Sequence, residues 1–233
     1  MPICRYKYDT ARLPLADRLA WISATDGDTP TVQMPVRMLG IDAPEFHYLG
    51  ASKDKPGKYD TQMESFLSEA GKGLDPGLKR YLKKRLTAKP CTRQISAGEA
   101  AFEHFKAMVQ HRLDRGAGKN GKARVPRKLF VTVAREVFDK NGRLLAYVNA
   151  SYNKAEWDSM PVSERPTFNL EMMQEGHAVS LLIFPNVPKP ADMELVQAAG
   201  RAARTGSLGQ WADNHRTLLQ YEFRWIVDTI QGT

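Results

Sequence analysis

The alternation of apolar and polar residues predicts two groups of short strands that lie far apart in the sequence. The first group comprises LAWISA, TVQM and VRMLG, which lie between residues 19 and 40 and are separated by turn residues. The second comprises LFVTVAREVF and RLLAYVN, joined by Asp139-Lys140-Asn141-Gly142. Because Asn-Gly readily supplies the two positive φ angles of a type I′ turn, this pair is expected to form a hairpin. Five short strands with helices between and after them predict a small barrel.

Four apolar residues of the first group share one parity: Val32, Met34, Val36 and Met38. If the strand pairing is continuous, these side chains form one core face and Arg37 points to the other face. Pro35 is expected to kink or interrupt this strand, because proline cannot donate a ladder hydrogen bond.

Apolar residues at steps of three and four predict helices between the two strand groups. One helix is expected from about residue 98 to 113, with its apolar face formed by Phe102, Phe105, Val109 and Leu113. Two inserted helices are expected upstream, on either side of a Gly- and Pro-containing break. Their apolar faces are formed by Tyr59, Met63, Phe66 and Ala70 and by Leu78, Leu82 and Leu86.

The second half of the chain is expected to contain two further helices. The first, Asn169 to Glu175, is closed by Gly176, and the second runs from Ala191 to Arg204. The polar segment from Asn153 to Pro166 is expected to be a loop. Aromatic residues fall on alternate positions between Leu219 and Val227, which favours a strand or an extended segment.

The size of the chain favours one decorated domain. With 233 residues, 42% of them hydrophobic, the chain can bury one sizeable core. We therefore expect a single domain over residues 1–233, with a helical insertion at about 47–97 and a C-terminal extension at about 212–233. No run of about 18 apolar residues and no apolar signal stretch at the N-terminus are present. We expect a monomeric, cytoplasmic protein that does not associate with membranes.

The net charge of +8 favours an acidic partner. The positive charge is concentrated between residues 72 and 128, here called the basic region, which contains 16 Lys and Arg but only 4 Asp and Glu. Such a region is suited to binding phosphates through counterion release. A solvated helix surface and a flexible basic loop would give the same composition, so both interpretations stay open.

Two acidic clusters follow predicted strands. Asp26-Gly27-Asp28-Thr29 alone would be read as a tight turn. The second cluster, Gly40-Ile41-Asp42-Ala43-Pro44-Glu45, places two acids at the end of a strand. Carboxylate and carbonyl oxygens form a hard site suited to Ca²⁺, Mg²⁺ or Mn²⁺ and not to zinc.

Two arginines could complete such a site. Arg37 precedes the second acidic cluster, and Arg143 follows the predicted hairpin turn. Each alone would be an unremarkable exposed arginine on a strand. The cleavage of a phosphodiester, however, needs cationic donors for its transition state, and a guanidinium is planar, permanently charged and bidentate.

These residues lie in motifs that resemble the staphylococcal-nuclease-like (thermonuclease) family. The matching motifs are DGDT at residues 26–29, VRMLGIDAPE at 36–45 and DKNGRLLAYV at 139–148. Weaker similarity is seen in FNLEMMQEGHA at 168–178 and over residues 191–211. The motifs occur in the family's order. The resemblance implies an α+β protein built on a five-stranded OB-fold β-barrel with flanking α-helices, here with a helical insertion.

The resemblance also implies a role for each residue of the site. It makes Asp28, Asp42 and the backbone carbonyl of Ala43 metal ligands, although Ala43 stands where the family usually has threonine. It makes Arg37 and Arg143 binders of the phosphate and the transition state, and Glu45 the carboxylate that activates water. Candidate contacts to the rest of the substrate are Lys83, Lys84, Arg85 and Lys140.

The implied activity is that of a metal-dependent nuclease that hydrolyses phosphodiester bonds of DNA, RNA or both. A metal-associated water would attack the phosphorus. Ca²⁺ is the expected ion, with Mg²⁺ or Mn²⁺ as alternatives, and nucleic acid is the expected partner. The alternative function is a catalytically inactive module of the same family that binds nucleic acid or protein. Degenerate members typically lose active-site charges, whereas all five charged residues are present here.

Overall fold

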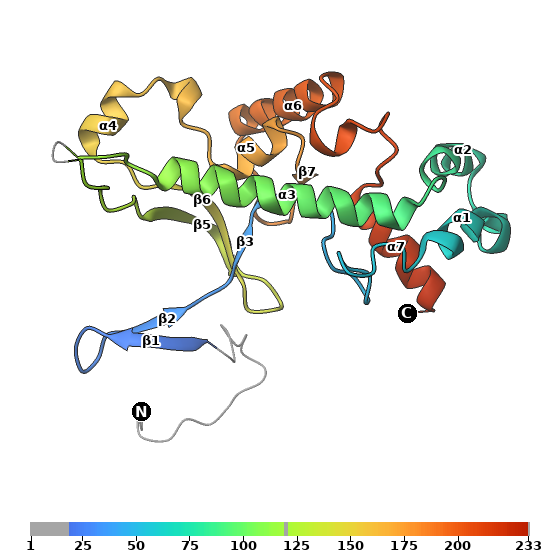
Figure 1. The fold of residues 1–233 in the computed structure, drawn as a ribbon, viewed down its shortest axis with the longest axis horizontal. Helices are drawn as coiled ribbons and strands as arrows, with labels where there is room; N and C mark the ends of the chain where they lie inside the picture. The colour runs from blue at the N-terminus through green and yellow to red at the C-terminus, as the bar shows by residue number, and fades with distance from the viewer. Residues whose placement is uncertain (1–18, 119–120, 233) are drawn as a thin grey trace.

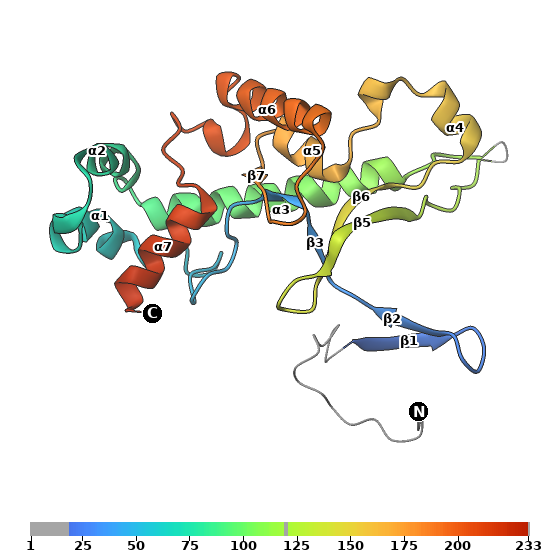
Figure 2. The same ribbon diagram turned by 180° about the vertical axis from the view of Figure 1, so that it is seen from behind.

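The computed structural model describes residues 19–118 and 121–232, which are arranged around one long helix, α3 (Pro90–Leu113) (Figure 1). Strands β3, β5 and β6 and the helices α4 to α6 lie along the middle and C-terminal part of α3, and α1, α2 and α7 lie around its N-terminal end (Figures 1 and 2). No helix of the described residues is long and apolar enough to cross a membrane. The expectation that the chain lacks an export signal concerns residues outside these ranges.

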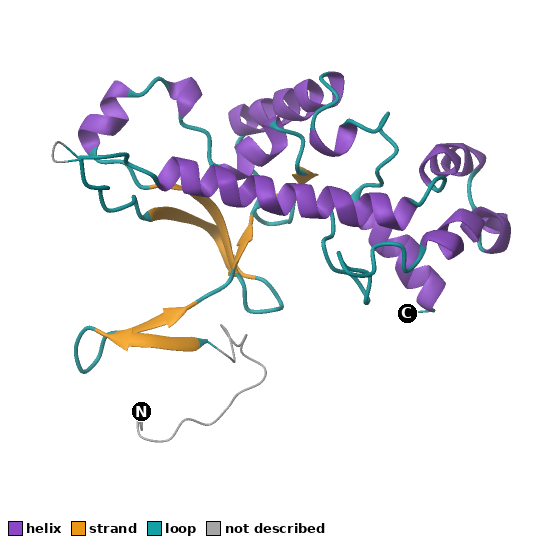
Figure 3. Cartoon of the chain, viewed as in Figure 1, coloured by secondary structure: helices purple, strands orange, loops and turns teal. Residues whose placement is uncertain are grey.

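In residues 19–118 and 121–232, the strands form three separate small sheets (Figure 3). The seven strands in this part of the chain are β1 (Ala20–Ala24), β2 (Pro30–Gln33), β3 (Val36–Met38), β4 (Gly40–Asp42), β5 (Leu129–Phe138), β6 (Leu144–Ala150) and β7 (Val179–Leu181). β1 pairs with β2, β4 pairs with β7, and β6 lies between β3 and β5. β3 runs parallel to β6, and the other pairs are antiparallel. Within the described residues no sheet closes into a barrel, so the expected five-stranded closure is not seen.

The hairpin β1–β2 projects away from the rest of the fold in both views (Figures 1 and 2). The predicted core face is therefore wrong for this arrangement, because Val32 and Val36 are exposed. The prediction required continuous pairing. Among the described strands, β2 pairs only with β1, and the extended strand is interrupted at Pro35, before β3 begins. Alternation identified the strands but not their partners.

The predicted hairpin of the second strand group is present as β5–β6, but its turn is not type I′. Of the two residues Asn141 and Gly142, only Gly142 has a positive φ, of 73°. The turn is closed by a hydrogen bond from the Gly142 amide to the Asp139 carbonyl and a second from the Asp139 amide to the Arg143 carbonyl. One left-handed residue, which glycine adopts without strain, is sufficient for this loop.

The predicted helices are confirmed with shifted ends. The described residues form seven α-helices, namely α1 (Asp60–Glu69), α2 (Pro76–Arg85), α3, α4 (Lys154–Ser159), α5 (Phe168–Gln174), α6 (Pro190–Thr205) and α7 (Gln220–Gln231). α3 begins eight residues earlier than predicted, at a proline in its first turn, where no amide hydrogen is needed. α4 lies in the segment expected to be a loop, and its N-terminus has a capping box formed by Asn153 and Glu156.

The C-terminal segment is a helix, and the predicted extended conformation is wrong. Phe223, Ile226 and Val227 are buried on one face of α7, at helical spacing. The alternating aromatics misled the prediction because Tyr221 and Trp225 are 52% and 40% exposed and do not share the buried face with Phe223. The buried face of α7 follows the helical spacing of Phe223, Ile226 and Val227, and not the alternation of the aromatic residues.

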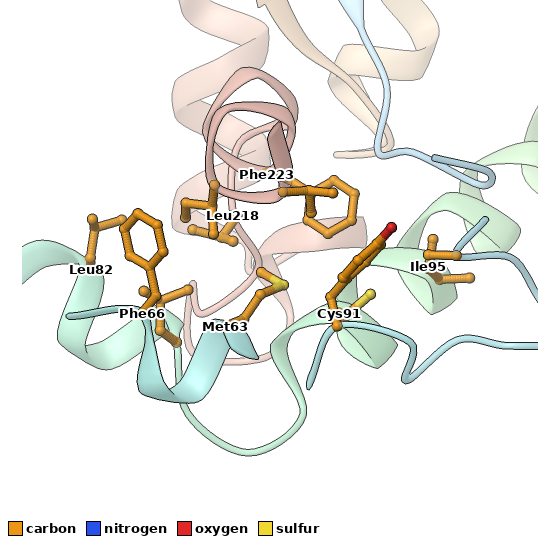
Figure 4. Close-up of a cluster of buried hydrophobic side chains, with 12 residues drawn as sticks. Met63, Phe66, Leu82, Cys91, Ile95, Leu218 and Phe223 are labelled. Atoms are coloured by element: carbon orange, nitrogen blue, oxygen red, sulfur yellow. The ribbon is translucent and has the colours of Figure 1, made fainter. Parts of the chain in front are cut away.

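The described residues contain two apolar clusters. The sheet cluster joins Ile41, Val148 and Ala150 to residues of α3, α5 and α6. The insertion cluster joins α1, α2 and the start of α3 to the C-terminal extension. Figure 4 labels seven of its members: Met63, Phe66, Leu82, Cys91, Ile95, Leu218 and Phe223. The insertion and the extension, which are far apart in sequence, thus share one core.

A buried asparagine holds the β3–β4 corner against β6. The Asn169 side chain in α5 accepts a hydrogen bond from the Val148 amide at 3.0 Å and donates one to the Leu39 carbonyl at 2.8 Å. It is 2% exposed. These bonds satisfy backbone groups that two short strands leave unpaired, which fixes the direction in which the chain enters β4.

The helix α3 approaches the chain after β4 very closely at Gly98. A Cβ atom added to Gly98 would lie 2.5 Å from the Glu45 carbonyl oxygen and 2.8 Å from the Phe46 amide nitrogen. Both are backbone atoms, so neither can turn away. The absence of a side chain at Gly98 therefore sets the position of the Glu45 backbone.

We predict that Gly98→Ala destabilises the protein. Gly→Ala inside a helix normally stabilises by up to about 1 kcal/mol, but the clash with the Glu45 peptide should reverse the sign and cost about 1 to 3 kcal/mol. Gly200→Ala in α6 is the matched control, because nothing lies within 4 Å of its added Cβ. Urea unfolding of the two variants measures the difference. A Gly98→Ala variant as stable as Gly200→Ala would contradict the close approach.

Candidate functional site

Asp42, the last residue of β4, has a buried carboxylate that is 2% exposed. Its Oδ1 accepts a hydrogen bond from Arg37 at 2.9 Å, and its Oδ2 accepts one from Arg224 at 2.8 Å. Arg37 lies in β3, beside Leu145 of β6. A buried charge is tolerated only when it is paired and hydrogen-bonded, and here each oxygen has its own guanidinium.

Glu45 shares one of these guanidinium groups with Asp42. Nη1 of Arg224 donates to Oε1 of Glu45 at 2.5 Å, while Nη2 of the same side chain donates to Asp42. The two carboxylates predicted to act together are therefore brought together, and one planar fork bridges them. Each side chain of this trio is at most 29% exposed.

Arg224 stays charged in this position. Burial alone would lower the pKa of Arg224, but its hydrogen bonds to Asp42 and Glu45 raise the pKa above the ordinary value of an arginine. The sequence analysis missed this residue. It lies 182 positions from Asp42, in a segment expected to be extended, and no motif marks it.

Arg143 is held by the turn of the β5–β6 hairpin. Its Nε donates to Oδ2 of Asp139 at 2.7 Å, and its backbone amide donates to Oδ1 of the same side chain. Burial alone would raise the pKa of Asp139, but these hydrogen bonds hold it below its usual value. The Arg143 side chain is 40% exposed, so its guanidinium is anchored on one edge and open to solvent elsewhere.

Arg37 and Arg143 line one open pocket of about 320 Å³. Ala43 and Pro44 line the same pocket, and so do the rings of Phe46 and Phe102, which stack 5.4 Å apart. Four of the predicted site residues, Arg37, Asp42, Ala43 and Glu45, thus lie in one stretch of chain around the end of β4. Arg143 reaches the same pocket from the neighbouring hairpin.

Asp28 is not part of this group. It lies in the exposed turn between β1 and β2, where its Oδ1 accepts a hydrogen bond from the Thr29 hydroxyl. The hairpin carries this turn away from β4 (Figure 1). In the part of the chain that the structure describes, no three His, Cys, Asp or Glu side chains are arranged to hold a metal ion.

The candidate contacts to the rest of the substrate are spread over two places. Lys83, Lys84 and Arg85 lie in the last turn of α2, beyond the N-terminal end of α3, and Arg85 packs over the Tyr81 ring. Lys140 is exposed in the β5–β6 turn, three residues from Arg143. Of these four residues, only Lys140 lies in the hairpin turn that also carries the pocket residue Arg143.

The oxygen atoms around the end of β4 are of the type that binds hard divalent cations. Asp42 and Glu45 offer carboxylate oxygens, and the chain between them offers the Ala43 carbonyl, as Ca²⁺ and Mg²⁺ require. The buried Asp42 carboxylate forms ion pairs with two cationic side chains, so positive charge is stabilised at this position. Completion of a metal site needs further oxygen ligands and the departure of one guanidinium.

The region after the insertion matches a known family. The family model of staphylococcal nuclease homologues matches residues 101–213, which include Arg143 but not the acidic clusters. No curated protein matches the chain. Regions of this family are nuclease-type or nucleic-acid-binding modules. The similarity of residues 101–213 to this family confirms the resemblance inferred from the motif at residues 139–148, whereas the motifs at 26–29 and 36–45 lie outside the matched region.

Proposed function

We propose that this protein is a divalent-cation-dependent endonuclease that hydrolyses phosphodiester bonds of nucleic acid at the pocket between Arg37 and Arg143. The observation that carries the proposal is that Arg37 of β3 and Arg143 of the β5–β6 turn line one open pocket with Ala43 and Pro44. The carboxylates of Asp42 and Glu45 flank the latter two residues in the sequence, and Asp42 is bonded to Arg37. The family match and the basic region support the same class of substrate.

Each side chain has a defined task in this proposal. The scissile phosphate enters the pocket, where Arg37 and Arg143 neutralise the charge that develops on its oxygens. Glu45 accepts a proton from the attacking water, and the pair with Asp139 keeps the Arg143 fork oriented. Asp42, Asp28 and the Ala43 carbonyl would hold a Ca²⁺ ion, with Mg²⁺ or Mn²⁺ as alternatives. The bound ion would supply Lewis-acid polarisation of the phosphate.

This function requires that Asp28 approaches Asp42, and we propose that β1–β2 docks on the free edge of β5 to complete a five-stranded barrel. Apolar side chains support this closure on both partners. Trp21 and Ile22 are 65% and 57% exposed, and Val131 and Val133 of β5 are 39% and 45% exposed. Covering such residues is favourable, and a long exposed apolar edge is otherwise an aggregation hazard.

The first test is cleavage of labelled single- and double-stranded DNA and RNA by the full chain, with Ca²⁺, Mg²⁺, Mn²⁺ or EDTA. We expect cleavage with at least one metal ion and none in EDTA. Arg143→Ala should lower the cleavage rate about 10²-fold to 10³-fold, because one donor to the transition state is lost. Glu45→Gln should lower it about 10²-fold to 10⁴-fold with little change in substrate binding.

Arg143 is a better probe than Arg37, because loss of Arg37 would leave an oxygen of the buried Asp42 without a partner. Arg135→Ala, an exposed arginine of the same hairpin, is the matched control and should cleave at the wild-type rate. Nucleic-acid binding without cleavage under every metal condition would favour the competing function, a binding module, which the Arg224 bridge across both carboxylates also supports.

The second test concerns the role assigned to Asp28. Asp28→Ala should weaken Ca²⁺ binding at least about tenfold, because loss of one carboxylate ligand removes both charge and coordination. Asp26→Ala changes the same charge in the same exposed turn and should have little effect. Calorimetric titration with CaCl₂ measures both variants. Equal affinities would show that Asp28 is not a ligand and would remove the need for hairpin docking at the site.

The third test concerns the basic region. Replacing Lys83, Lys84 and Arg85 by Gln should weaken nucleic-acid binding and flatten its salt dependence, by about 1 in the logarithmic slope for each lost phosphate contact. Binding is measured with an Mg²⁺-free, non-cleaved duplex at several salt concentrations. An unchanged slope would exclude α2 from the binding surface.

A control triple variant removes three exposed lysines outside the basic region, namely Lys53, Lys55 and Lys154. It carries the same loss of charge. Its slope should match that of the wild type, which separates local phosphate contacts from an effect of overall charge.

A further inference from the structure

Arg224 occupies the place between two carboxylates that a bridging cation would take. Its two terminal nitrogens donate to Oδ2 of Asp42 and Oε1 of Glu45, at 2.8 and 2.5 Å. With Arg37 on Oδ1, both oxygens of Asp42 are used. We infer that Arg224 is an internal cation that holds this carboxylate pair until a divalent ion binds and that competes with the ion for Asp42. The inference rests on the proposed metal-dependent function.

The helix that carries Arg224 is fixed independently of the carboxylates. Phe223, Ile226 and Val227 are buried in the insertion cluster on the face of α7 that packs against α1 and α2. Beyond Arg224, the Tyr48 hydroxyl donates to Asp228 at 2.6 Å. The loss of the ion pairs would therefore leave α7 in place.

The side chain of Arg224, in contrast, is able to leave. It is 29% exposed, and its hydrogen bonds to Asp42 and Glu45 hold only its terminal nitrogens. A change of rotamer that breaks these two contacts would carry the guanidinium into solvent without moving the backbone of α7. The movement that frees Asp42 is thus confined to one side chain.

The exchange is expected because the site cannot hold all the cations together. A divalent ion placed on Asp42 beside both Arg37 and Arg224 would meet two like charges in a buried environment, where repulsion is poorly screened. The Arg37 and Arg224 side chains are similarly exposed, at 27% and 29%, but the proposed function needs Arg37 at the phosphate, so Arg224 is the group that withdraws. The apparent Kd for the ion then equals the intrinsic Kd divided by the fraction of molecules in which Arg224 is not bonded to Asp42.

This competition is tested with Arg224→Gln in the full chain, titrated calorimetrically with CaCl₂ in the absence of nucleic acid. We expect the apparent Kd for Ca²⁺ to fall at least about tenfold, because the competitor is lost. In EDTA, the same variant should melt at a lower temperature than the wild type, since two carboxylates lose their shared partner. Ca²⁺ should then raise its melting temperature more than that of the wild type.

Arg201→Gln is the matched control. It makes the same change of charge at an exposed position of α6, and both its Kd and its melting temperature should match those of the wild type. Arg224→Lys serves if Arg224→Gln does not fold in EDTA. A lysine keeps the charge but cannot bridge two carboxylates with a planar fork, so its apparent Kd should lie below that of the wild type.

Two results would overturn the inference, and they are distinguishable. If wild-type protein binds Ca²⁺ and the folded Arg224 variants bind it equally or more weakly, Arg224 supports the site and does not compete, while the proposed function stands. If neither the wild type nor the variants bind Ca²⁺, Mg²⁺ or Mn²⁺, the proposed metal dependence fails and the competition fails with it.

Discussion

The burial of the Asp42 carboxylate is the constraint around which the site is built. A carboxylate that is 2% exposed must be compensated, and the fold supplies one guanidinium from the adjacent strand and another from the C-terminal helix. The first partner comes from a neighbour in sequence, which keeps β3 and β4 in a fixed relation. The second comes from α7 and ties the extension to the strand region. The same carboxylate thus joins the strand region to the C-terminal extension.

The helical insertion and the C-terminal extension together hold the helix that carries Arg224. Neither could bury its apolar face alone, and together they form the insertion cluster around Phe66, Leu82 and Phe223. That cluster holds α7 in the position from which Arg224 donates hydrogen bonds to Asp42 and Glu45. Gly98 brings α3 close to the Glu45 peptide. The orientation of Glu45 therefore depends on packing outside the matched family region as well as on the strands.

The sequence predicts local features of this protein well and long-range pairing poorly. The helices α1 and α2 were found because apolar residues at steps of three and four report one buried face. Arg37, Asp42 and Glu45 were found because they lie within nine positions of one another and form a motif with a clear chemistry. Arg224 was missed because its contact to Asp42 spans 182 positions and leaves no periodic signal. The helix α7 was misread because its aromatic and aliphatic residues follow different periods, and the barrel was overstated because alternation cannot assign strand partners.

The charges at the site serve stability and chemistry at the same time, and the two demands differ. Without a cation, Asp42 and Glu45 repel each other, and a guanidinium between them is the most economical compensation that a side chain can offer. With a cation, the same guanidinium is an obstacle. A fold can satisfy both demands only if the compensating group departs without disturbing the backbone, which requires its helix to be anchored elsewhere. The insertion cluster provides that anchor, so an apolar core remote from the pocket makes an exchangeable charge possible within it.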